Sequence, residues 1–365
     1  MNKTVMIIGL YFLAICLALQ PFTFAAHDLL IGENGENCKV LIINKTDVII
    51  HNPYSNVDFE TTNHYKANLH THTTESDGSS SPSEVIYHYN NIGGYHILAI
   101  TDHNKNTWPW NNWISEEPLE KSDSSEYYPD LNMLAISGNE MSIGHHRGSL
   151  LNPYSNGGLF MRLSFWFIEK QNGLCLFYHP GRYNHDVEWY QRYFDNYDDC
   201  IVGIEVYNQG DKYSDDRILW DCINKERDPN GLIWGFSNDD MHRISSHAFR
   251  NYQHFLMANL TEENFRTAMI DGSFYFSYEP NGSKSNDPSY GQARTPQLIY
   301  VDIQGNTIQI ISDNVDSVNW YDEDSQIVSM NNSYDVSMID SNFVRAVLIN
   351  DYGSTYTQPF GIYYE

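Results

Sequence analysis

The chain has 365 residues, of which 41% are hydrophobic and 14% aromatic, so it can bury a large core and is not a disordered chain. Its 47 acidic residues outnumber its 21 basic residues, which gives a formal net charge of −26. A surface of that sign disfavours long polyanions, so general nucleic-acid binding is not expected, whereas a small phosphoester held by metal ions is compatible with it.

Residues 1–25 have the pattern of a secretory signal peptide: a positively charged start, an apolar stretch over 5–19 and a small residue, Ala25, suited to cleavage. The apolar stretch is short, so no membrane span is expected after cleavage. Cys16 lies in a sequence close to a lipobox, but Ile15 stands where a small residue is usual, and lipidation is the less favoured alternative. We therefore predict a protein exported to the periplasm or the exterior.

After cleavage four cysteines remain: Cys38, Cys175, Cys200 and Cys222. They lack the close spacing of a structural zinc site, and in an oxidising compartment they allow three disulfide pairings between which the sequence does not choose. Cys175 lies in an apolar run, so we expect it to be a buried free thiol.

Residues 26–62 are expected to form a β-hairpin segment with strands over 40–43 and 48–50. From residue 63 onward, short apolar runs typical of strands buried on both faces alternate with stretches typical of helices. The predicted strands are 97–100, 133–136, 174–178, 201–206 and 232–236, and the predicted helices are 82–91, 159–172, 188–197, 215–225 and 262–269. This alternation predicts βαβ units in an α/β domain over 63–285, with a parallel sheet or barrel.

The pattern changes after about residue 295, where strands of period two follow one another without helices. These strands are predicted over 297–301, 307–312, 317–321 and 344–349. The sequence therefore predicts a small C-terminal antiparallel β-sandwich over 286–365.

Histidines and acids recur at the ends of the predicted strands. Side chains alternate between the faces of a strand, so His70 and His72 point the same way and can hold one metal ion. The further candidate ligands are Asp77, His103, Glu140, His145 or His146, His179, Asp240 and His242. Most of them fall at or just after the carboxyl end of a strand, the rim where (β/α) barrels assemble their active sites. Imidazole and carboxylate ligands suit zinc, manganese or iron.

The motifs that carry these residues resemble, in order, those of the PHP (polymerase and histidinol phosphatase) family. They are His70-Thr71-His72, Ser76-Asp77-Gly78, Thr101-Asp102-His103, Gly138-Asn139-Glu140, Tyr178-His179-Pro180 and Asp240-Met241-His242, spread over roughly residues 66–245. The resemblance implies a distorted (β/α)7 barrel, up to three divalent metal ions and phosphoesterase activity.

The resemblance also implies how the ligands divide. One ion would be held by His70, His72, Glu140 and Asp240, a second by Glu140, His179 and a histidine after Glu140, and a third by Asp77, His103 and His242. The family usually has a glycine–histidine pair after the glutamate. His145 is favoured over His146 because it directly follows Gly144. The position of Asp77 is a histidine in some relatives.

Further roles are expected for residues within or near these motifs. Asp240 or His242 is expected to handle a proton, and Arg182 to contact a phosphate oxygen or to form a surface salt bridge. Glu205 is expected to support the site, and Asp102 to orient a ligand or to satisfy backbone groups. The aromatic segment 104–130 would either stack on the substrate or pack its own tryptophans.

These observations predict an exported metal-dependent phosphoesterase that hydrolyses a phosphate mono- or diester by a metal-bridging hydroxide. The substrate would be a small phosphoester with an aromatic or sugar moiety. Two alternatives stay open: a hydrolase of the same fold that acts on an amide or a sugar-linked ester, and an exported binding protein without turnover.

Overall fold

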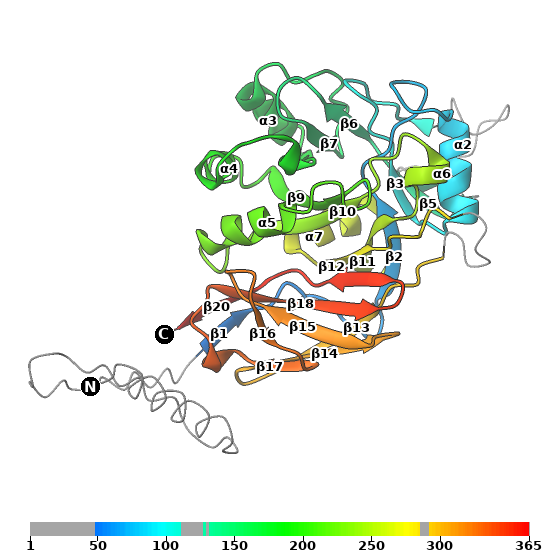
Figure 1. Ribbon diagram of the computed structural model, residues 1–365. Coiled ribbons are helices and arrows are strands. Elements are labelled where there is room, and N and C mark those ends of the chain that lie inside the picture. The colour runs from blue at the N-terminus through cyan, green and yellow to red at the C-terminus, as the bar shows by residue number, and fades with distance from the viewer. Residues whose placement is uncertain (1–47, 111–126, 129–130, 285–291, 365) are drawn as a thin grey trace, which may run out of the picture. The chain divides into compact units, whose positions relative to one another are not determined.

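The computed structural model describes residues 48–110, 127–128, 131–284 and 292–364, which belong to one compact unit spanning Asp47–Glu365 (Figure 1). The predicted signal peptide, the strand expected over 40–43 and Cys38 lie outside the described residues. The unit mixes helices with three β-sheets, so the predicted α/β class is confirmed at this level.

The largest sheet has twelve strands, in the order β1–β20–β18–β19–β12–β11–β2–β3–β5–β4, with β15 and β16 attached through β18. These strands are β1 (Val48–His51), β2 (Asn63–Asn68), β3 (Ile97–Ala99), β4 (Tyr127–Tyr128), β5 (Met133–Ile136), β11 (Asn251–Met257), β12 (Phe274–Tyr278), β15 (Ser317–Tyr321), β16 (Ile327–Ser329), β18 (Phe343–Asn350), β19 (Gly353–Tyr356) and β20 (Phe360–Tyr364). Strands β2, β3 and β5 are parallel. Strand β1 pairs with β20, and the hairpin partner predicted for it, residues 40–43, lies outside the described residues.

The second sheet has five strands, in the order β10–β9–β8–β7–β6. They are β6 (Gly138–Met141), β7 (Arg147–Leu150), β8 (Leu174–Phe177), β9 (Ile201–Asn208) and β10 (Trp234–Asn238), and all their residues are buried. Strands β8, β9 and β10 are parallel, as predicted, but β7 runs antiparallel to both its neighbours. The expectation of a purely parallel arrangement is therefore corrected here.

Two isolated parallel bridges join the sheets. Thr71, after β2, is bridged to Met241, after β10, and His103, after β3, is bridged to Glu140 in β6. The bridges lie where β2, β3 and β10 end, which brings the carboxyl ends of strands from both sheets together.

The predicted helices are present, four of them shorter than predicted and the last longer by two residues. They are α2 (Pro82–Tyr87), α3 (Met161–Lys170), α4 (Val187–Phe194), α5 (Asp216–Lys225) and α7 (Glu262–Asp271), joined by α6 (Ile244–His247), the π-helix η1 (His88–Ile92) and the 3-10 helices η4 (Pro180–Arg182) and η5 (Val336–Met338). Ser81 and Glu84 form a capping box that starts α2. Among the described residues, no helix is long and apolar enough to cross a membrane.

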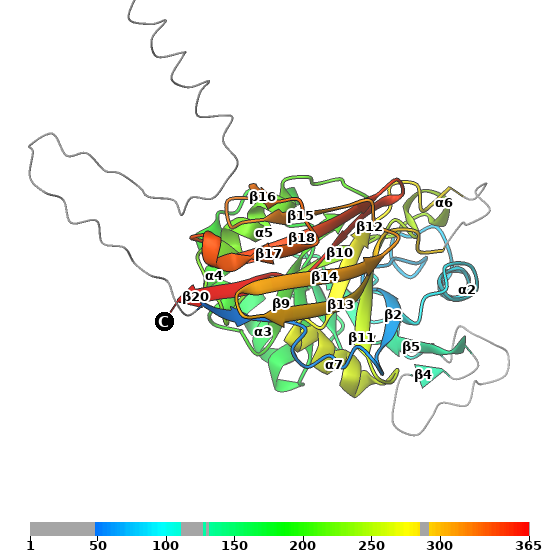
Figure 2. The same cartoon turned by 90° about the horizontal axis from the view of Figure 1, so that it is seen from below.

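The C-terminal strands are not confined to a separate sheet. A three-stranded sheet is formed by β13 (Gln297–Gln304), β14 (Thr307–Asp313) and β17 (Ser333–Asp335), whereas β18, β19 and β20 extend the largest sheet beside β12 (Figure 2). Both groups share a buried cluster that includes Leu298, Ile310, Trp320 and Leu348. The C-terminal residues therefore form antiparallel strands, as predicted, and of these β15, β16, β18, β19 and β20 belong to the sheet that carries β2.

Two further predictions concern the thiol of Cys175 and the aromatic segment 104–130. Cys175 is a buried free thiol, as predicted, and its Sγ lies 3.6 Å from that of Cys200. In the aromatic segment, Trp110 is fully buried in a core cluster with Tyr89 and Met133, so this ring packs within the fold. Residues 111–126 of that segment lie outside the described residues.

Candidate metal centre

The candidate ligands described first come from six places in the chain and meet at one edge of the two sheets. His70 and His72 follow β2, His103 follows β3 and Glu140 lies in β6. The others come from the second sheet, with His179 after β8 and Asp240 and His242 after β10. His146 immediately precedes β7, and because β7 is antiparallel, its amino end lies at the edge where the parallel strands finish.

Glu140 lies at the centre of the cluster. Its Oε2 is 3.3 Å from His70 Nε2, 3.1 Å from His72 Nε2 and 3.0 Å from His103 Nδ1. Its Oε1 is 2.7 Å from His146 Nδ1 and 3.1 Å from His179 Nε2. The two oxygens of one carboxylate therefore face two different sets of imidazole nitrogens, the arrangement expected of a bridging ligand.

Two further carboxylates complete the cluster. Asp240 Oδ1 lies 3.4 Å from His70 Nε2, 3.2 Å from His72 Nε2 and 3.4 Å from His242 Nδ1. Asp77 Oδ2 lies 3.5 Å from His103 Nε2 and 3.3 Å from His242 Nε2. Ligand atoms thus gather in four overlapping groups, which are His70–His72–Asp240, His70–Glu140–His179, His103–Glu140–His146 and His72–Asp77–His103–His242.

The donor atoms fit divalent metal ions. Within the described part of the chain, the buried Nε2 atoms of His70 and His72, Nδ1 of His103 and Oε2 of Glu140 have no hydrogen-bond partner. A buried polar atom without a partner is costly, and four such atoms aimed at one another indicate a missing ligand. In tetrahedral zinc sites with bonds of about 2.0–2.1 Å, neighbouring ligand atoms lie about 3.3 Å apart, which matches these separations.

The structure corrects the choice between the two histidines after Gly144. His146 contacts Glu140, whereas His145 hydrogen-bonds through Nε2 to Tyr190 Oη and through Nδ1 to the His146 carbonyl. The His145 ring stacks on Tyr183, with ring centroids 4.2 Å apart. His145 therefore packs behind the site, because adjacent residues at the start of a strand face opposite ways.

Glu205 orients the deepest ligand. Its Oε1 lies 2.8 Å from His70 Nδ1, and its Oε2 accepts hydrogen bonds from the His179 backbone N–H at 2.7 Å and from Asn208 Nδ2 at 2.9 Å. With Nδ1 donating to Glu205, His70 presents Nε2 to the cluster. The Tyr178 ring stacks on His70 at 3.7 Å and holds its plane.

Asp102 satisfies backbone and hydroxyl groups, which is one of the two roles predicted for it. It accepts hydrogen bonds from the backbone N–H and the hydroxyl of Thr73, each at 2.7 Å, and from the hydroxyls of Ser76 and Thr107. These bonds hold the turn that carries Asp77. Gly78 is required in this turn, since an added Cβ would lie 2.5 Å from the His72 carbonyl oxygen.

Two of the candidate ligands have a left-handed backbone conformation, which non-glycine residues rarely adopt. His179 has φ 30° and Asp240 has φ 44°. Next to Asp240, the Asp239 carboxylate accepts hydrogen bonds from the backbone N–H groups of Phe249, Arg250 and Asn251. Such backbone persists only where the surroundings fix it, and it clusters at functional sites.

The electrostatics of the cluster keep its carboxylates ionised. Burial alone would raise the pKa of Glu140, but the charge on His70 and the hydrogen bonds from His146 and His179 hold it well below its usual range. Burial lowers the pKa of His72, but the carboxylates of Asp240 and Glu140 outweigh this effect and raise it to about 9. Without a metal ion, His70 and His72 would therefore hold protons.

A cavity of about 300 Å³ opens onto the cluster. Its lining includes the predicted Arg182 and three residues that the sequence analysis missed, Ser142, Gln209 and Lys212. Lys212 Nζ donates to Gln209 Oε1 at 3.0 Å, and Gln209 Nε2 donates to the Asp240 carbonyl at 3.1 Å. Gln209 and Lys212 follow β9, so strand-end position is the signal that could have found them.

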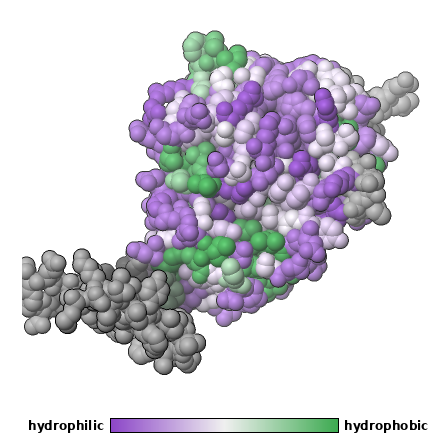
Figure 3. Space-filling view, in the orientation of Figure 1, coloured by the Kyte–Doolittle hydropathy of each residue, from purple (hydrophilic) through white to green (hydrophobic). Residues whose placement is uncertain are grey.

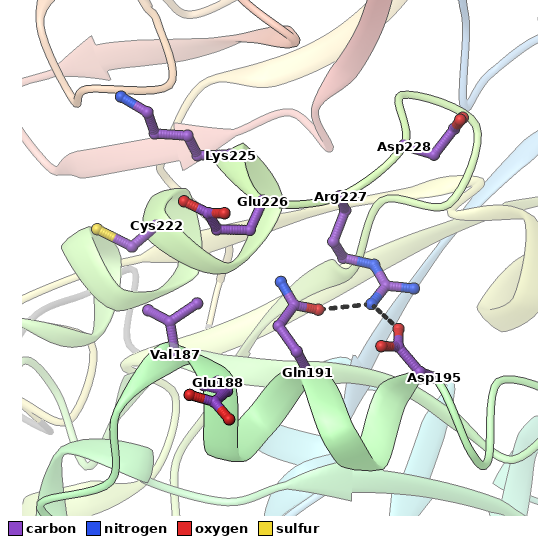
Figure 4. A pocket seen from close by; sticks show the side chains of 9 residues that line it. All are labelled: Val187, Glu188, Gln191, Asp195, Cys222, Lys225, Glu226, Arg227 and Asp228. Carbon is purple, nitrogen blue, oxygen red and sulfur yellow. Dashed lines mark hydrogen bonds and ion pairs between the residues drawn. The ribbon is translucent and has the colours of Figure 1, made fainter.

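A larger groove of about 750 Å³, between α4 and α5, differs in its charged residues from the cavity beside the metal cluster (Figure 4). Arg227 is bound there by Gln191 Oε1 at 2.7 Å and Asp195 Oδ1 at 3.1 Å, and Lys225 Nζ lies 2.6 Å from Asp324 Oδ1. Its cations are therefore neutralised by the protein's own acids.

No family model matches this chain, and no curated protein matches it. Among solved structures, it is similar to a two-domain protein containing a predicted PHP-like metal-dependent phosphoesterase from Bacteroides vulgatus ATCC 8482, with 15% identity and a TM-score of 0.48 over 84% of this chain and 88% of that one. An amidohydrolase from Chromobacterium violaceum, with bound sulfate and no metal, has 17% identity and a TM-score of 0.35 over 48% of this chain and 87% of that one.

Endonuclease Q in complex with a 27-mer duplex substrate carrying an abasic lesion has 14% identity and a TM-score of 0.37, over 57% of this chain and 56% of that one. All three likenesses are weak in identity and in structural score. The functional assignment below therefore rests on the residues of the site itself.

Proposed function

We propose that this chain is an exported metal-dependent phosphoesterase. The observation that carries the proposal is Glu140, whose two oxygens face two sets of imidazoles, with Asp77, Asp240 and His242 completing the cluster beside the cavity. Up to three divalent ions, zinc, manganese or iron, would occupy the four groups. Such ions make water acidic enough to ionise near neutral pH and neutralise phosphate oxygens.

The cations of the cavity favour an anionic substrate over a neutral amide. Arg182 and Lys212 line the same space as Glu140 and reach it from the segments after β8 and β9. Arg182 offers forked donors to two phosphate oxygens, and Lys212 offers a point charge. A small phosphoester with an aromatic or sugar moiety, as a mono- or diester, is the proposed substrate class.

His242 is the residue that we propose moves a proton. Its side chain is 25% exposed, and its two ring nitrogens face the carboxylates of Asp240 and Asp77 at 3.4 Å and 3.3 Å. His103, 24% exposed, and Asp77 share this open side of the cluster, whereas His70 and His72 are fully buried. The open side is where a substrate oxygen would meet a proton donor.

The test is activity of the metal-loaded protein on phosphomonoesters, phosphodiesters and amides. We expect metal-dependent hydrolysis of at least one ester class. His146→Ala should lower this activity by about 100-fold or more because it removes a ligand, and His145→Ala, the matched control, should lower it far less. Hydrolysis of amides alone would contradict the phosphoesterase proposal and indicate a hydrolase of another class. A metal-loaded protein that is inert on every ester would indicate a binding protein.

A further inference from the structure

Helix α3 is apolar on both its faces. Phe165 and Ile168 are fully buried against the second sheet's core cluster. On the opposite face, Leu163, Trp166 and Phe167 are 48%, 46% and 43% exposed. Large apolar side chains that gather on an exposed face mark a contact surface, so the outer face of α3 has the composition of one.

The apolar surface extends beyond the helix. Leu159 and Phe160, directly before α3, are 65% and 68% exposed, and Ile143 is 44% exposed. We call these residues the α3 patch: Ile143, Leu159, Phe160, Leu163, Trp166 and Phe167. Four of them, all except Ile143 and Trp166, line a groove of about 450 Å³. Figure 3 shows a green apolar area at the top of the molecule, where Figure 1 places α3.

The α3 patch is continuous with the mouth of the metal site. Ser142 lines the cavity, and its neighbour Ile143 donates a backbone hydrogen bond to the Gly157 carbonyl at 3.0 Å, two residues before Leu159. Asn104 fixes this connection, because its Oδ1 accepts from the Ser142 backbone N–H at 3.0 Å. A molecule seated with its phosphoester in the cavity therefore meets apolar surface immediately beyond Ser142.

Charge around the patch suits a lipid headgroup. Arg162 and Lys170 are exposed on α3, and the helix carries one acid, Glu169, whose Oε1 lies 3.4 Å from Lys170 Nζ. Helix α3 therefore carries one net positive charge, in a chain with a net charge of −26. Two copies of so acidic a chain repel one another, whereas a zwitterionic bilayer does not repel either copy. Trp, Phe and Leu beside Arg and Lys are the residues of interfacial membrane contacts.

We propose that the α3 patch docks on a lipid surface and presents the metal site to phosphoesters carried by amphiphilic molecules in that surface. The apolar part of such a molecule would lie against Ile143, Leu159 and Phe160 while its phosphate reaches Arg182 and Lys212. The substrate part of this inference rests on the proposed phosphoesterase function. The docking part does not depend on catalysis.

Flotation of the full chain with phosphatidylcholine vesicles tests the docking. Wild type should float with the vesicles, and Leu159→Ser/Phe160→Ser/Phe167→Ser should lose at least about tenfold in bound fraction, because three exposed apolar anchors are removed. Ile311→Ser/Met338→Ser, which changes exposed residues on other elements, is the matched control and should float like wild type. The N-terminal apolar segment is the same in all three proteins, so it does not contribute to the difference.

Equal flotation of wild type and triple variant, or no flotation, would overturn the proposal. So would a wild-type dimer in sedimentation that the triple variant abolishes without any vesicle binding, since a second copy would then cover the patch. The single variant Phe160→Ser, at the most exposed position, repeats the test if the triple variant does not fold.

A second measurement separates the docking from the chemistry. The triple variant should keep its activity on a short soluble phosphoester and lose at least about tenfold on a phosphoester embedded in vesicles. Equal losses on both substrates would contradict the lipid-borne substrate. Patch-dependent flotation by a protein inert on every ester would leave the docking in place and remove the phosphoesterase proposal.

Discussion

The cluster around Glu140 and the ion pair between Asp221 and Arg345 are both buried, but they are satisfied in different ways. Arg345 Nε and Nη2 donate to the two oxygens of Asp221 at 2.7 Å and 2.6 Å, and the guanidinium lies 4.7 Å from the centre of the Tyr321 ring. Around Glu140, by contrast, nitrogens of His70, His72 and His103 face one carboxylate oxygen without a hydrogen bond.

The difference separates a structural contact from a binding site. The Asp221–Arg345 pair joins α5 to β18 through two hydrogen bonds between opposite charges, and of the guanidinium nitrogens only Nη1 lacks a partner among the described residues. The Glu140 cluster holds nitrogens and carboxylate oxygens that have no hydrogen-bond partner among the described residues, so it has the composition of a divalent-metal site. Substitutions in the two clusters should therefore affect different measurements.

The largest effect is expected from Glu140→Gln. This change removes the charge that faces two sets of imidazoles, so the protein should lose more than one equivalent of metal and at least about a thousandfold in activity. Elemental analysis and kinetic assays measure both. Unchanged metal content would refute the bridging role.

Asp221→Ala should act on stability and leave the metal content unchanged. It strands Arg345 as an unpaired buried charge, which costs about 3–5 kcal/mol in the free energy of unfolding. Urea denaturation measures this loss. The control is Asp324→Ala, which removes a half-exposed pair with Lys225 and should cost less than about 1 kcal/mol. Similar losses for the two variants would contradict the distinction between the clusters.

Glu205→Gln should weaken metal binding without removing a ligand. The carboxylate that accepts from His70 Nδ1 is replaced by a neutral amide, and loss of such support costs about 10–100-fold in metal affinity. Competition with a chelator measures the affinity. Glu169→Gln, on α3 and away from the cluster, should leave it unchanged.

The smallest effect is a dependence of metal affinity on pH. The raised pKa of His72, about 9, means that the metal-free protein keeps this proton through neutral pH and releases it when a metal binds. Affinity should therefore rise by about tenfold per pH unit for each proton released as the pH approaches 9. The same proton stabilises the metal-free fold below about pH 6.5, and that contribution is lost as the pH rises through 9.

Titration calorimetry in buffers of different ionisation enthalpy counts the released protons. An affinity that does not change between pH 7 and 9 would show that the imidazoles are already neutral before the metal binds.

The sequence was most informative where local chemistry dominates. The apolar runs at 174–178 and 201–206 are strands because their residues are buried on both faces, and Ser81 starts a helix through its own hydroxyl and Glu84. Long-range pairing was not accessible in this way. The partner of β1 is β20, some 300 residues along the chain, and no local pattern specifies it.

In the candidate site, too, local patterns were predictable and long-range arrangement was not. Eight of the nine predicted ligands lie together in one cluster, and residue types and strand-end positions were enough to select them as candidates. The choice of His146 over His145 required the direction of β7, because a strand's direction decides which of two adjacent side chains faces the edge. Lys212 lines the cavity only because β9 ends beside it.

The sequence by itself determined an α/β chain with an acidic surface and a set of metal-ligating residues at its strand ends, because composition, period and residue chemistry are local properties. Only the tertiary structure decided that the two oxygens of Glu140 face different imidazoles, that Glu205 fixes the tautomer of His70 and that the apolar surface of α3 begins beside Ser142. Those are distances between residues far apart in the chain, and packing of the whole core sets them.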